Sequence, residues 1–497
     1  MTERATVAAF FAVVLGASLL ATAARRFKGG GALPTLGGWA LADRRLGALW
    51  TWLLLGATVF TAYTFIAVPG LVFSAGALGF FPLAYTVIVC PLMFAALPRI
   101  WVIARREGHV TAGDFVRGRY GSPTLALAVS LTGILATMPY LALQLVGVRA
   151  VLAVCGPFSS GVGADATMIA VFAVPAIATF RHGLRTPAVL SAAKTAAIFA
   201  TVAVALFLVL RTSGGPGRLV DAASARLAGN GTTLTTLGPH QDAAFATLAL
   251  GSALALPMYP HVFTAGLAAS DPSALRRACV ALPAWTLVLG LFGFLGVAAL
   301  AAGISVPPGH DDATLPLLLS GLVPRPALGL MLGAIALGAL VPASVMSIAA
   351  GSWFARDVYV EYLDRSATPK RQVRVARTVS VVAKVGAIAF VLGLRDQDAV
   401  NLQLLGGVWI LQTAPTIVLG LRDRRPGDRA LLTGWAAGMA AGTVLVVSGG
   451  FSSVIPVGLG GLTVRVYAGL AALVVNLAVT AAITAVRPRP QVGAVLS

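Results

Sequence analysis

The chain has 497 residues, of which 58% are hydrophobic and only 11% are charged, whereas soluble domains carry about a quarter charged residues. This composition excludes a soluble enzyme, a disordered chain and a disulfide scaffold. The 36 Lys and Arg outnumber the 17 Asp and Glu, giving a net charge of +19. Such a surplus indicates nucleic-acid binding only where the basic residues form one face of a soluble domain. The cysteines Cys90, Cys155 and Cys279 lie far apart in apolar stretches, which is typical of core residues.

Apolar runs long enough to cross a bilayer recur along the whole chain. The hydrocarbon core is about 30 Å thick and takes roughly 20 helical residues. We predict thirteen spans, at residues 5–24, 46–73, 78–97, 125–154, 166–180, 188–210, 244–267, 278–300, 327–354, 379–394, 401–419, 431–448 and 466–486. The first run is followed, not preceded, by basic residues, so it is expected to be a retained span and not a cleaved signal peptide.

The distribution of the basic residues predicts the orientation of these spans. Most Lys and Arg lie in the loops that follow the odd-numbered spans and in the C-terminal tail. By the positive-inside rule this predicts an N-terminus outside and a C-terminus in the cytoplasm. The basic surplus is then a topology signal, so no nucleic-acid partner is expected. No loop is long enough for a catalytic domain, and we find no P-loop, zinc-spaced Cys or His pair or nucleophile elbow. Neither an enzyme, a cofactor nor a metal is predicted.

Ionisable groups within the predicted spans are few. All acidic residues fall in loops or at span ends, so no carboxylate is expected at mid-membrane depth. The groups inside spans are Lys194, Lys384 and His261. Each lysine either extends its ammonium to the inner interface or is a buried amine that changes its charge during transport. His261 either binds an anion or relays protons, or it satisfies a carbonyl of a broken helix.

Two spans carry helix breakers at comparable depth. Span 2 contains TAYTFIAVPG at 61–70, and span 7 contains LPMYPH at 256–261. Each proline frees a carbonyl, which a bilayer tolerates only where protein or a water-filled cavity satisfies it. Interrupted helices at matching positions in two halves indicate a transporter substrate site, whereas a single proline kink would be unremarkable. Spans 2–11 then form two consecutive five-helix units, at 46–210 and 244–421, and the odd number of spans inverts the second unit.

The sequence therefore predicts an all-α integral membrane protein with an inverted five-plus-five helix repeat and two discontinuous helices. Residues 46–421 are expected to form the ten-helix transporter core. Residues 1–45 add an N-terminal span with its cytoplasmic loop, and residues 422–497 add two C-terminal spans and a short tail.

Several segments resemble the sodium:solute symporter family, and the likeness runs from about residue 38 to the end of span 12. The family-level segments are GWALADRRLG at 38–47, GHVTAGDFVRGRYG at 108–121 and RDVYVEYL at 356–363. Others resemble its bacterial monocarboxylate permease branch, namely GLRTPAVLSAAK at 183–194, YPHVFTAGLAAS at 259–270, VPASVMSIAAG at 341–351 and NLQLLGGVWILQTAP at 401–415. The resemblance implies a bacterial cytoplasmic membrane protein that takes up short monocarboxylates such as lactate, pyruvate, acetate or propionate, linked to protons or sodium.

The chain departs from the family at the positions that hold sodium. In sodium-coupled members the ion lies between carbonyls of the first core helix, here about Ala57 and Phe60, and hydroxyls on the eighth. The matching hydroxyl positions are Val341 and Pro342, which have no side-chain oxygen. A common Asp on the fifth core helix is matched by Ser191, and Lys194 stands where many members have Gln.

We therefore hypothesise that the Lys194 ammonium occupies the place that the sodium ion takes in relatives. Lys194, together with Ser191 and Lys384, is expected to couple transport to the movement of protons. Proton linkage without sodium is the expected mode.

A carboxylate substrate needs hydrogen-bond donors and positive potential, which the broken helix ends can offer. The side chains expected to line its site are Thr61, Tyr63, Thr64, Gln144, Tyr259, His261, Trp409 and Gln412. The threonines can instead bond to the preceding turn, and Trp409 can simply pack. A sodium-coupled symporter of another small solute, such as an amino acid, stays open as the alternative. A membrane sensor or a membrane-embedded enzyme is less favoured, because no signalling domain or catalytic cluster is visible.

Overall fold

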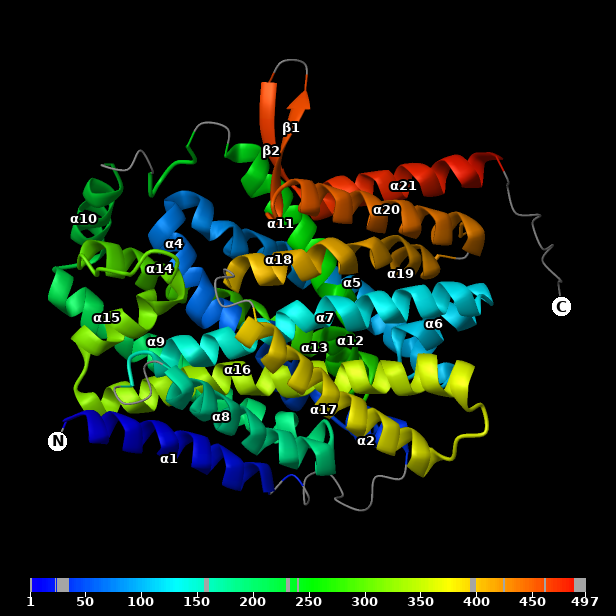
Figure 1. The fold of residues 1–497 in the computed structure, drawn as a ribbon, viewed down its shortest axis with the longest axis horizontal. Coiled ribbons are helices and arrows are strands. Elements are labelled where there is room, and N and C mark those ends of the chain that lie inside the picture. The colour runs from blue at the N-terminus through cyan, green and yellow to red at the C-terminus, as the bar shows by residue number, and fades with distance from the viewer. Residues whose placement is uncertain are drawn as a thin grey trace.

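The computed structural model describes residues 2–22, 24, 35–155, 161–228, 233–238, 241–393, 399–422, 425–459 and 462–486. The basic residues predicted to follow the first span at 25–28, and the predicted C-terminal tail, lie outside this part of the chain. Long helices run side by side along one axis of the molecule (Figure 1). They are α1 (Thr2–Thr22), α5 (Phe81–Arg106), α7 (Pro123–Leu152), α8 (Gly161–His182), α9 (Arg185–Ser213), α14 (Pro283–Ala301), α16 (Arg325–Trp353), α17 (Pro369–Gly393), α20 (Asp428–Ser448) and α21 (Ala468–Val486).

Two predicted spans are interrupted helices; the second breaks at its prolines, whereas the first breaks at Phe60, before its proline Pro69, which lies within helix. The first consists of α3 (Ala48–Val59), the π-helix η3 (Tyr63–Ala67) and α4 (Val68–Ala75). The second consists of α11 (Asp242–Ala255), the 3-10 turn η6 (Leu256–Met258) and α12 (Pro260–Leu267), and its two arms are bent by 52°. A third helix is divided into α18 (Ala399–Ile410), the 3-10 turn η9 (Leu411–Thr413) and α19 (Ala414–Gly420).

The number of spans differs from the predicted thirteen. Among the described residues, eleven helices are long and apolar enough to cross a membrane, or twelve if the bent pair counts as one span. The difference arises at the first break, because Ala48–Val59 is a short apolar helix whereas Tyr63–Arg106 runs as one helical stretch through η4 (Gly76–Phe80) into α5. The count of thirteen is therefore not confirmed, although each predicted run contains helix.

Short elements that the apolar runs did not predict lie between the long helices. They are α2 (Leu36–Leu41), η2 (Ala42–Arg44), α6 (Ala112–Tyr120), α10 (Pro216–Ala228), α13 (Pro272–Ala281), η7 (Asp311–Ala313), α15 (Thr314–Leu322) and the π-helix η8 (Phe354–Leu363). A hairpin of β1 (Val454–Leu459) and β2 (Leu462–Tyr467) projects from the bundle (Figure 1). The last span consequently begins at Ala468, because Val466 belongs to β2.

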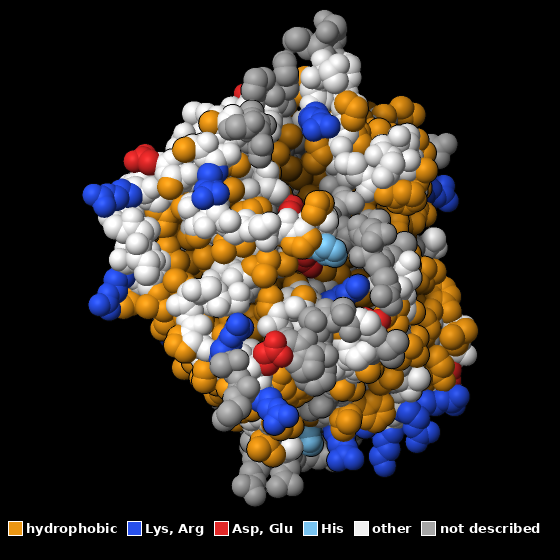
Figure 2. Space-filling view, turned by 60° about the vertical axis from the view of Figure 1, so that its left-hand side comes forward, with side chains coloured by type: hydrophobic (Ala, Val, Ile, Leu, Met, Phe, Trp, Pro, Cys, Tyr) orange, Lys and Arg blue, Asp and Glu red, His pale blue; other side chains and the backbone are white. Residues whose placement is uncertain are grey.

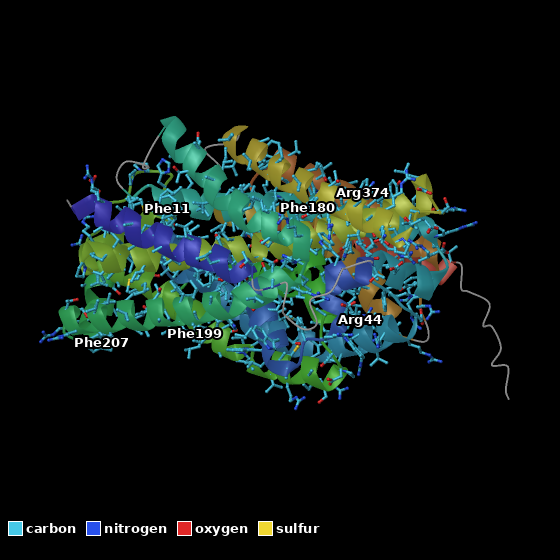
Figure 3. All side chains as sticks on the ribbon, turned by 90° about the horizontal axis from the view of Figure 1, so that it is seen from below. Phe11, Arg44, Phe180, Phe199, Phe207 and Arg374 are labelled. Carbon is cyan, nitrogen blue, oxygen red and sulfur yellow. The ribbon has the colours of Figure 1, made fainter. Side chains whose placement is uncertain are left out.

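Helix α16 forms the centre of the bundle, and its residues from Leu328 onward are almost all buried. Helix α1 packs on it closely because α16 has glycines there: a Cβ on Gly329 would lie 2.2 Å from the carbonyl oxygen of Thr6. Seen from below, Phe207 of α9 lies toward one end of the bundle and Arg374 of α17 toward the other (Figure 3).

The outer surface of the bundle is largely apolar, as a membrane protein requires. Hydrophobic side chains spread over the face seen in Figure 2, and Lys and Arg side chains lie both at its margins and among them. Large exposed apolar residues include Leu19, Leu49, Ile177, Phe207 and Leu287.

Candidate functional site at the two broken helices

The first break exposes backbone groups that neighbouring side chains satisfy. Helix α3 ends at Val59, and Phe60 is extended, with φ −93° and ψ 101°. The amide of Ala62 donates to Gln144 Oε1 at 3.1 Å, and Gln144 Nε2 donates to the carbonyl oxygen of Tyr140 one turn earlier on α7. Thr61 Oγ1 accepts from the amide of Tyr63 at 3.2 Å. Gln144 and Thr61 therefore hold the broken backbone in shape, and both are fully buried.

The second break turns at Tyr259, which is extended between η6 and α12, with φ −62° and ψ 137°. Pro257 and Pro260 flank this residue, so neither can donate a backbone hydrogen bond. The hydroxyl of Tyr259 donates to the carbonyl oxygen of Gln403 on α18 at 3.3 Å. His261 follows in the first turn of α12, where helix amides point outward with positive potential.

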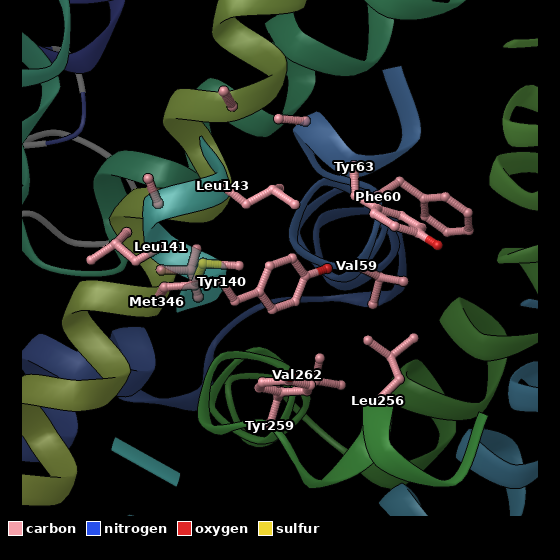
Figure 4. Close-up of a cluster of buried hydrophobic side chains, with 14 of the residues drawn as sticks. Val59, Phe60, Tyr63, Tyr140, Leu141, Leu143, Leu256, Tyr259, Val262 and Met346 are labelled. Atoms are coloured by element: carbon pink, nitrogen blue, oxygen red, sulfur yellow. The ribbon is translucent and has the colours of Figure 1, made fainter. Parts of the chain in front are cut away.

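The two breaks meet around an aromatic cluster. The ring of Tyr140 lies 5.2 Å from that of Tyr259 and 5.3 Å from that of His261, edge to face in both cases. The Tyr140 hydroxyl points toward the first break (Figure 4) and hydrogen-bonds with the Thr61 side chain. Four of the predicted site residues, Thr61, Gln144, Tyr259 and His261, thus lie around Tyr140, whereas the ring of Tyr63 lies 6.4 Å from that of Tyr85 on α5. Tyr140 was missed because nothing in its own span marks it.

His261 differs from its neighbours in its hydrogen bonding. The side chain is 0% exposed, yet neither ring nitrogen has a hydrogen-bond partner among the described residues. Thr264, one turn further along α12, is equally buried, and its hydroxyl also lacks a partner there. Buried polar groups are normally satisfied. A ligand with both donor and acceptor atoms could satisfy them. Thr64, the other predicted threonine, is buried on η3.

Lys194 of α9 is fully buried and makes three hydrogen bonds through its ammonium. Its Nζ donates to the carbonyl oxygens of Ala57 at 2.6 Å, Phe60 at 2.7 Å and Gly338 at 2.9 Å. Ala57 and Phe60 lie at the end of α3, where carbonyls lack intrahelical donors. An ammonium has three N–H donors, and each has an acceptor here. We call these three carbonyls and the lysine the Lys194 clasp.

The surroundings of the Lys194 clasp are apolar. The ammonium lies 5.3 Å from the ring centroid of Phe65 and 5.9 Å from that of Trp285, which are cation–π distances. Val341 packs with Ala57 in a small buried cluster. The Lys194 side chain is 0% exposed, so its ammonium does not extend to the membrane interface.

The remaining predicted coupling residues take no part in the clasp. The hydroxyl of Ser191 donates back to the carbonyl oxygen of Ala188 at 2.7 Å. Lys384 of α17 is 5% exposed, and its ammonium contacts the hydroxyl of Ser380 at 3.3 Å one turn earlier. It is therefore buried as well, in a separate place.

Two predicted substrate residues on α18 and η9 point to the C-terminal helices. Trp409 Nε1 donates to Thr443 of α20 at 3.2 Å. Gln412 Nε2 donates to the carbonyl oxygen of Gly469 at 3.3 Å, and Asn476 of α21 donates to the carbonyl oxygen of Gln412 at 2.9 Å. These side chains join α20 and α21 to the core, and their polar groups are not directed at the aromatic cluster. The sequence does not indicate whether these side chains face the aromatic cluster or face α20 and α21, because the apolar runs of α18 and its partners have no clear period.

The chain that leads into α3 is held on three sides. We call residues 39–46 the entry strap. Asp43 pairs with Arg185 of α9 at 2.9 Å, Arg44 donates to the carbonyl oxygen of His109, and the amide of Leu46 donates to the carbonyl oxygen of Ala268 at 3.2 Å. Within the strap, Ala42, Asp43 and Arg44 have φ of 48°, 57° and 54°. Three consecutive left-handed residues without glycine are costly, so the surrounding contacts must hold them.

A buried charge cluster at the end of α16 was also missed. Asp357 is 0% exposed and accepts from Thr111 Oγ1 at 2.8 Å and Ser130 Oγ at 2.7 Å, with Arg117 at 3.5 Å. Asp114 of α6 accepts from Arg356 at 2.8 Å. The sequence segments 108–121 and 356–363 carry these residues, but nothing in either segment indicates that they pair.

A cavity of about 440 Å³ lies next to the broken helices. Its lining comes from α4, α5, α11 and α18 and from the turn before β1, and it includes Leu71, Phe81, Leu248 and Leu404. Asn401, also in the lining, holds this turn through hydrogen bonds with Phe451 and Ser453.

Comparison with known proteins agrees with this architecture. The model of the sodium:solute symporter family matches residues 39–438. A monocarboxylate transport permease protein of Rhizobium johnstonii is 42% identical over 453 residues, which is 90% of each chain. The uncharacterized symporter YodF of Bacillus subtilis is 30% identical over 82% of each chain. A solved Na⁺-coupled sialic acid symporter in a substrate-bound, outward-open state is 16% identical, with a TM-score of 0.78 over 98% of each chain.

The structural likeness confirms the predicted fold class, an all-α membrane protein with discontinuous helices. The family match and the permease relative identify a secondary active solute transporter of the membrane and not an enzyme. The chain belongs to the sodium:solute symporter family.

Proposed function

We propose that the protein takes up short monocarboxylates of the lactate, pyruvate, acetate or propionate type, linked to protons and independent of sodium. The observation that carries this proposal is the Lys194 clasp. The carbonyls of Ala57 and Phe60, which the family resemblance assigns to sodium, already accept hydrogen bonds from an ammonium. Val341 and Pro342 offer no side-chain oxygen in their place. A hard cation that needs several oxygen ligands therefore has no site there.

The proton takes over the coupling role in this proposal. The protonated amine ties α9 to α3 and α16 through three hydrogen bonds, whereas a neutral amine can donate only two. Loss of the proton therefore weakens the connection between the first broken helix and α16. Such a two-state contact is what a coupling ion provides in alternating access.

The substrate class rests on charge and on the name of the relative. A positive site and the first turn of α12 favour an anion, and His261 and Thr264 leave donors and acceptors without partners. The relative that is 42% identical is named a monocarboxylate transport permease. We place the carboxylate between the two breaks, near Thr61 and His261.

The basic loops support an N-terminus outside and a C-terminus in the cytoplasm of a bacterial inner membrane. In this orientation the entry strap lies on the cytoplasmic side. Domain limits at residues 45 and 421 belong to the same proposal, with the ten-helix core between them.

The test is uptake of labelled pyruvate by proteoliposomes in which sodium is replaced by choline at fixed pH. We expect uptake to persist without sodium and to fall when a protonophore collapses an inward proton gradient. Lys194→Gln, which installs the residue that many relatives have, should abolish accumulation against a gradient, and Lys384→Gln measures whether the second buried lysine, which lies apart from the clasp, shares the coupling role.

A strict requirement for sodium would contradict the proposal and favour the alternative, a sodium-coupled symporter of another small solute. Competition by lactate, acetate, propionate and alanine tests the substrate separately. If only amino acids compete, the monocarboxylate assignment is wrong even when sodium is dispensable.

A further inference from the structure

The third carbonyl of the Lys194 clasp comes from an unusual place. Gly338 lies in the interior of α16, where a carbonyl normally accepts from the amide four residues later. That residue is Pro342, which has no amide hydrogen. The carbonyl of Gly338 is therefore left without its helical donor inside a continuous helix, and Lys194 Nζ supplies the missing hydrogen bond at 2.9 Å.

We infer that Pro342 is a positioning residue for Lys194, and that lysine and proline act as a pair. This inference rests on the proposed coupling role of Lys194. An ammonium buried without a carboxylate needs an acceptor for each of its three hydrogens. The end of α3 provides two, and Pro342 provides the third by freeing Gly338. The proline thus ties the charge to α16 as well as to the broken helix.

Close packing around Gly338 supports this role. A Cβ on Gly338 would lie 2.8 Å from the ring of Phe65, so the glycine lets α16 approach η3. Phe65 also lies beside the ammonium. Among the described residues, no acidic side chain hydrogen-bonds or pairs with Lys194, and Phe65 and Trp285 are the rings that face it. Backbone carbonyls are therefore the compensation for its charge.

Pro342 provides an oxygen ligand for Lys194 indirectly, through the backbone of Gly338. The resemblance to sodium-coupled relatives implies that position 342 lacks a hydroxyl that those relatives use as a ligand. In the structure the proline at this position frees a different oxygen, the backbone carbonyl of Gly338 one turn earlier, which accepts from Lys194. Restoring an amide at position 342 would let Gly338 return to its helical hydrogen bond, and Lys194 would compete for it.

A double-mutant cycle tests whether Pro342 acts through Lys194. Counterflow of labelled pyruvate, which needs no accumulation against a gradient, is measured over a pH series for Pro342→Ala, Lys194→Gln and the double variant in proteoliposomes. We expect Pro342→Ala to lower uptake about tenfold, the size of a lost hydrogen bond to a charged group. Its pH of half-maximal uptake should move toward acid. In the Lys194→Gln background the same change should add nothing.

Pro98→Ala is the matched control, because Pro98 is also buried inside a long helix, α5, away from the clasp. It should leave the pH profile unchanged. Pro342→Val restores the same amide without adding a side-chain oxygen and serves if Pro342→Ala does not fold.

Additive losses in the double variant would overturn the inference and leave Pro342 as a residue that only shapes α16. If Lys194→Gln changes neither uptake nor its pH profile, the proposed coupling itself fails. The two outcomes are therefore distinguishable.

Discussion

Arg185 donates to the carboxylate of Asp43 at 2.9 Å, and this ion pair attaches the chain before α3 to the first turn of α9. Further along the same helix, Lys194 binds the carbonyls at the other end of α3. Helix α9 therefore holds α3 at both ends. A transport cycle that moves the first broken helix must loosen at least one of these attachments.

The entry strap is expected to detach during transport. Leu46 and Ala269 form a bridge between the strap and the turn after α12, a spacing that suits a disulfide. In a background without Cys90, Cys155 and Cys279, Leu46→Cys with Ala269→Cys should lose uptake on oxidation and regain it with reductant. The measurement is initial uptake before and after reduction.

A disulfide placed where no motion is expected provides the control. Val457 and Val464 are paired in the β1–β2 hairpin, so the same double cysteine change there should leave uptake unaffected on oxidation. Undiminished uptake with the strap fully cross-linked would show that the strap stays in place throughout the cycle.

The Asp43–Arg185 pair should affect the conformational balance more than the stability. The Asp43 side chain is 38% exposed and that of Arg185 is 5% exposed, but an asparagine at position 43 keeps an oxygen that can accept from Arg185, which limits the loss to about 1 kcal/mol. Asp43→Asn is therefore expected to leave the melting temperature nearly unchanged while making a cysteine placed at Leu46 react faster with a thiol reagent. Equal labelling rates in both proteins would contradict this.

Gln144 and Gln412 are both buried glutamines, but their substitutions should have different effects. Gln144→Ala removes the acceptor of the Ala62 amide at the first break, so uptake should fall at least about tenfold. Gln412→Ala removes the hydrogen bonds of the Gln412 side chain with the carbonyl oxygen of Gly469 and with the side-chain amide of Asn476, so it should lower the melting temperature and largely spare the uptake of folded protein. Parallel losses in both variants would instead place Gln412 in the transport pathway.

Asp271 gives a stability prediction with a defined pH dependence. It caps α13, and the hydrogen bond from the amide of Ala274, followed by that from Ser270, lowers the pKa of its carboxyl below the usual 3.8. A lowered pKa in the folded state stabilises the protein above the unfolded value, and that stabilisation is lost as pH falls through the folded pKa.

Asp271→Ala should therefore reduce the free energy of unfolding by about 1 kcal/mol near neutral pH. The difference from the unmodified protein should shrink below about pH 4. Thermal unfolding in detergent at both pH values checks this. A difference that is constant with pH would mean that the carboxylate contributes nothing as a cap.

The second broken helix was predictable because proline acts locally, and Pro257 and Pro260 flank the break. The first break lies at Phe60, before Pro69, so the sequence indicated the interrupted span but not the residue at which it breaks. Composition alone requires the membrane. The Ala57 and Phe60 contacts of Lys194 were foreseen only through the resemblance to relatives, since no pattern within α3 or α9 indicates that a lysine will reach a helix end.

Other parts of the site depend on which face a side chain takes. Trp409 and Gln412 lie in an apolar run whose neighbours are apolar all round, so hydropathy does not say whether they face the aromatic cluster or α20. Asp357 and Asp114 come from distant segments and meet only in the folded bundle. The third acceptor, Gly338, has no side chain for a sequence pattern to register.

The left-handed residues of the entry strap have an energetic consequence for the direction of motion. Each non-glycine residue in this conformation costs roughly 1–2 kcal/mol, and Ala42, Asp43 and Arg44 adopt it in succession. The contacts with Arg185, His109 and Ala268 therefore hold the strap in an unfavourable backbone conformation. Any state that breaks these contacts and lets the three residues leave the left-handed region recovers their conformational free energy. Opening at this end of the bundle then needs less work than the number of broken hydrogen bonds would indicate.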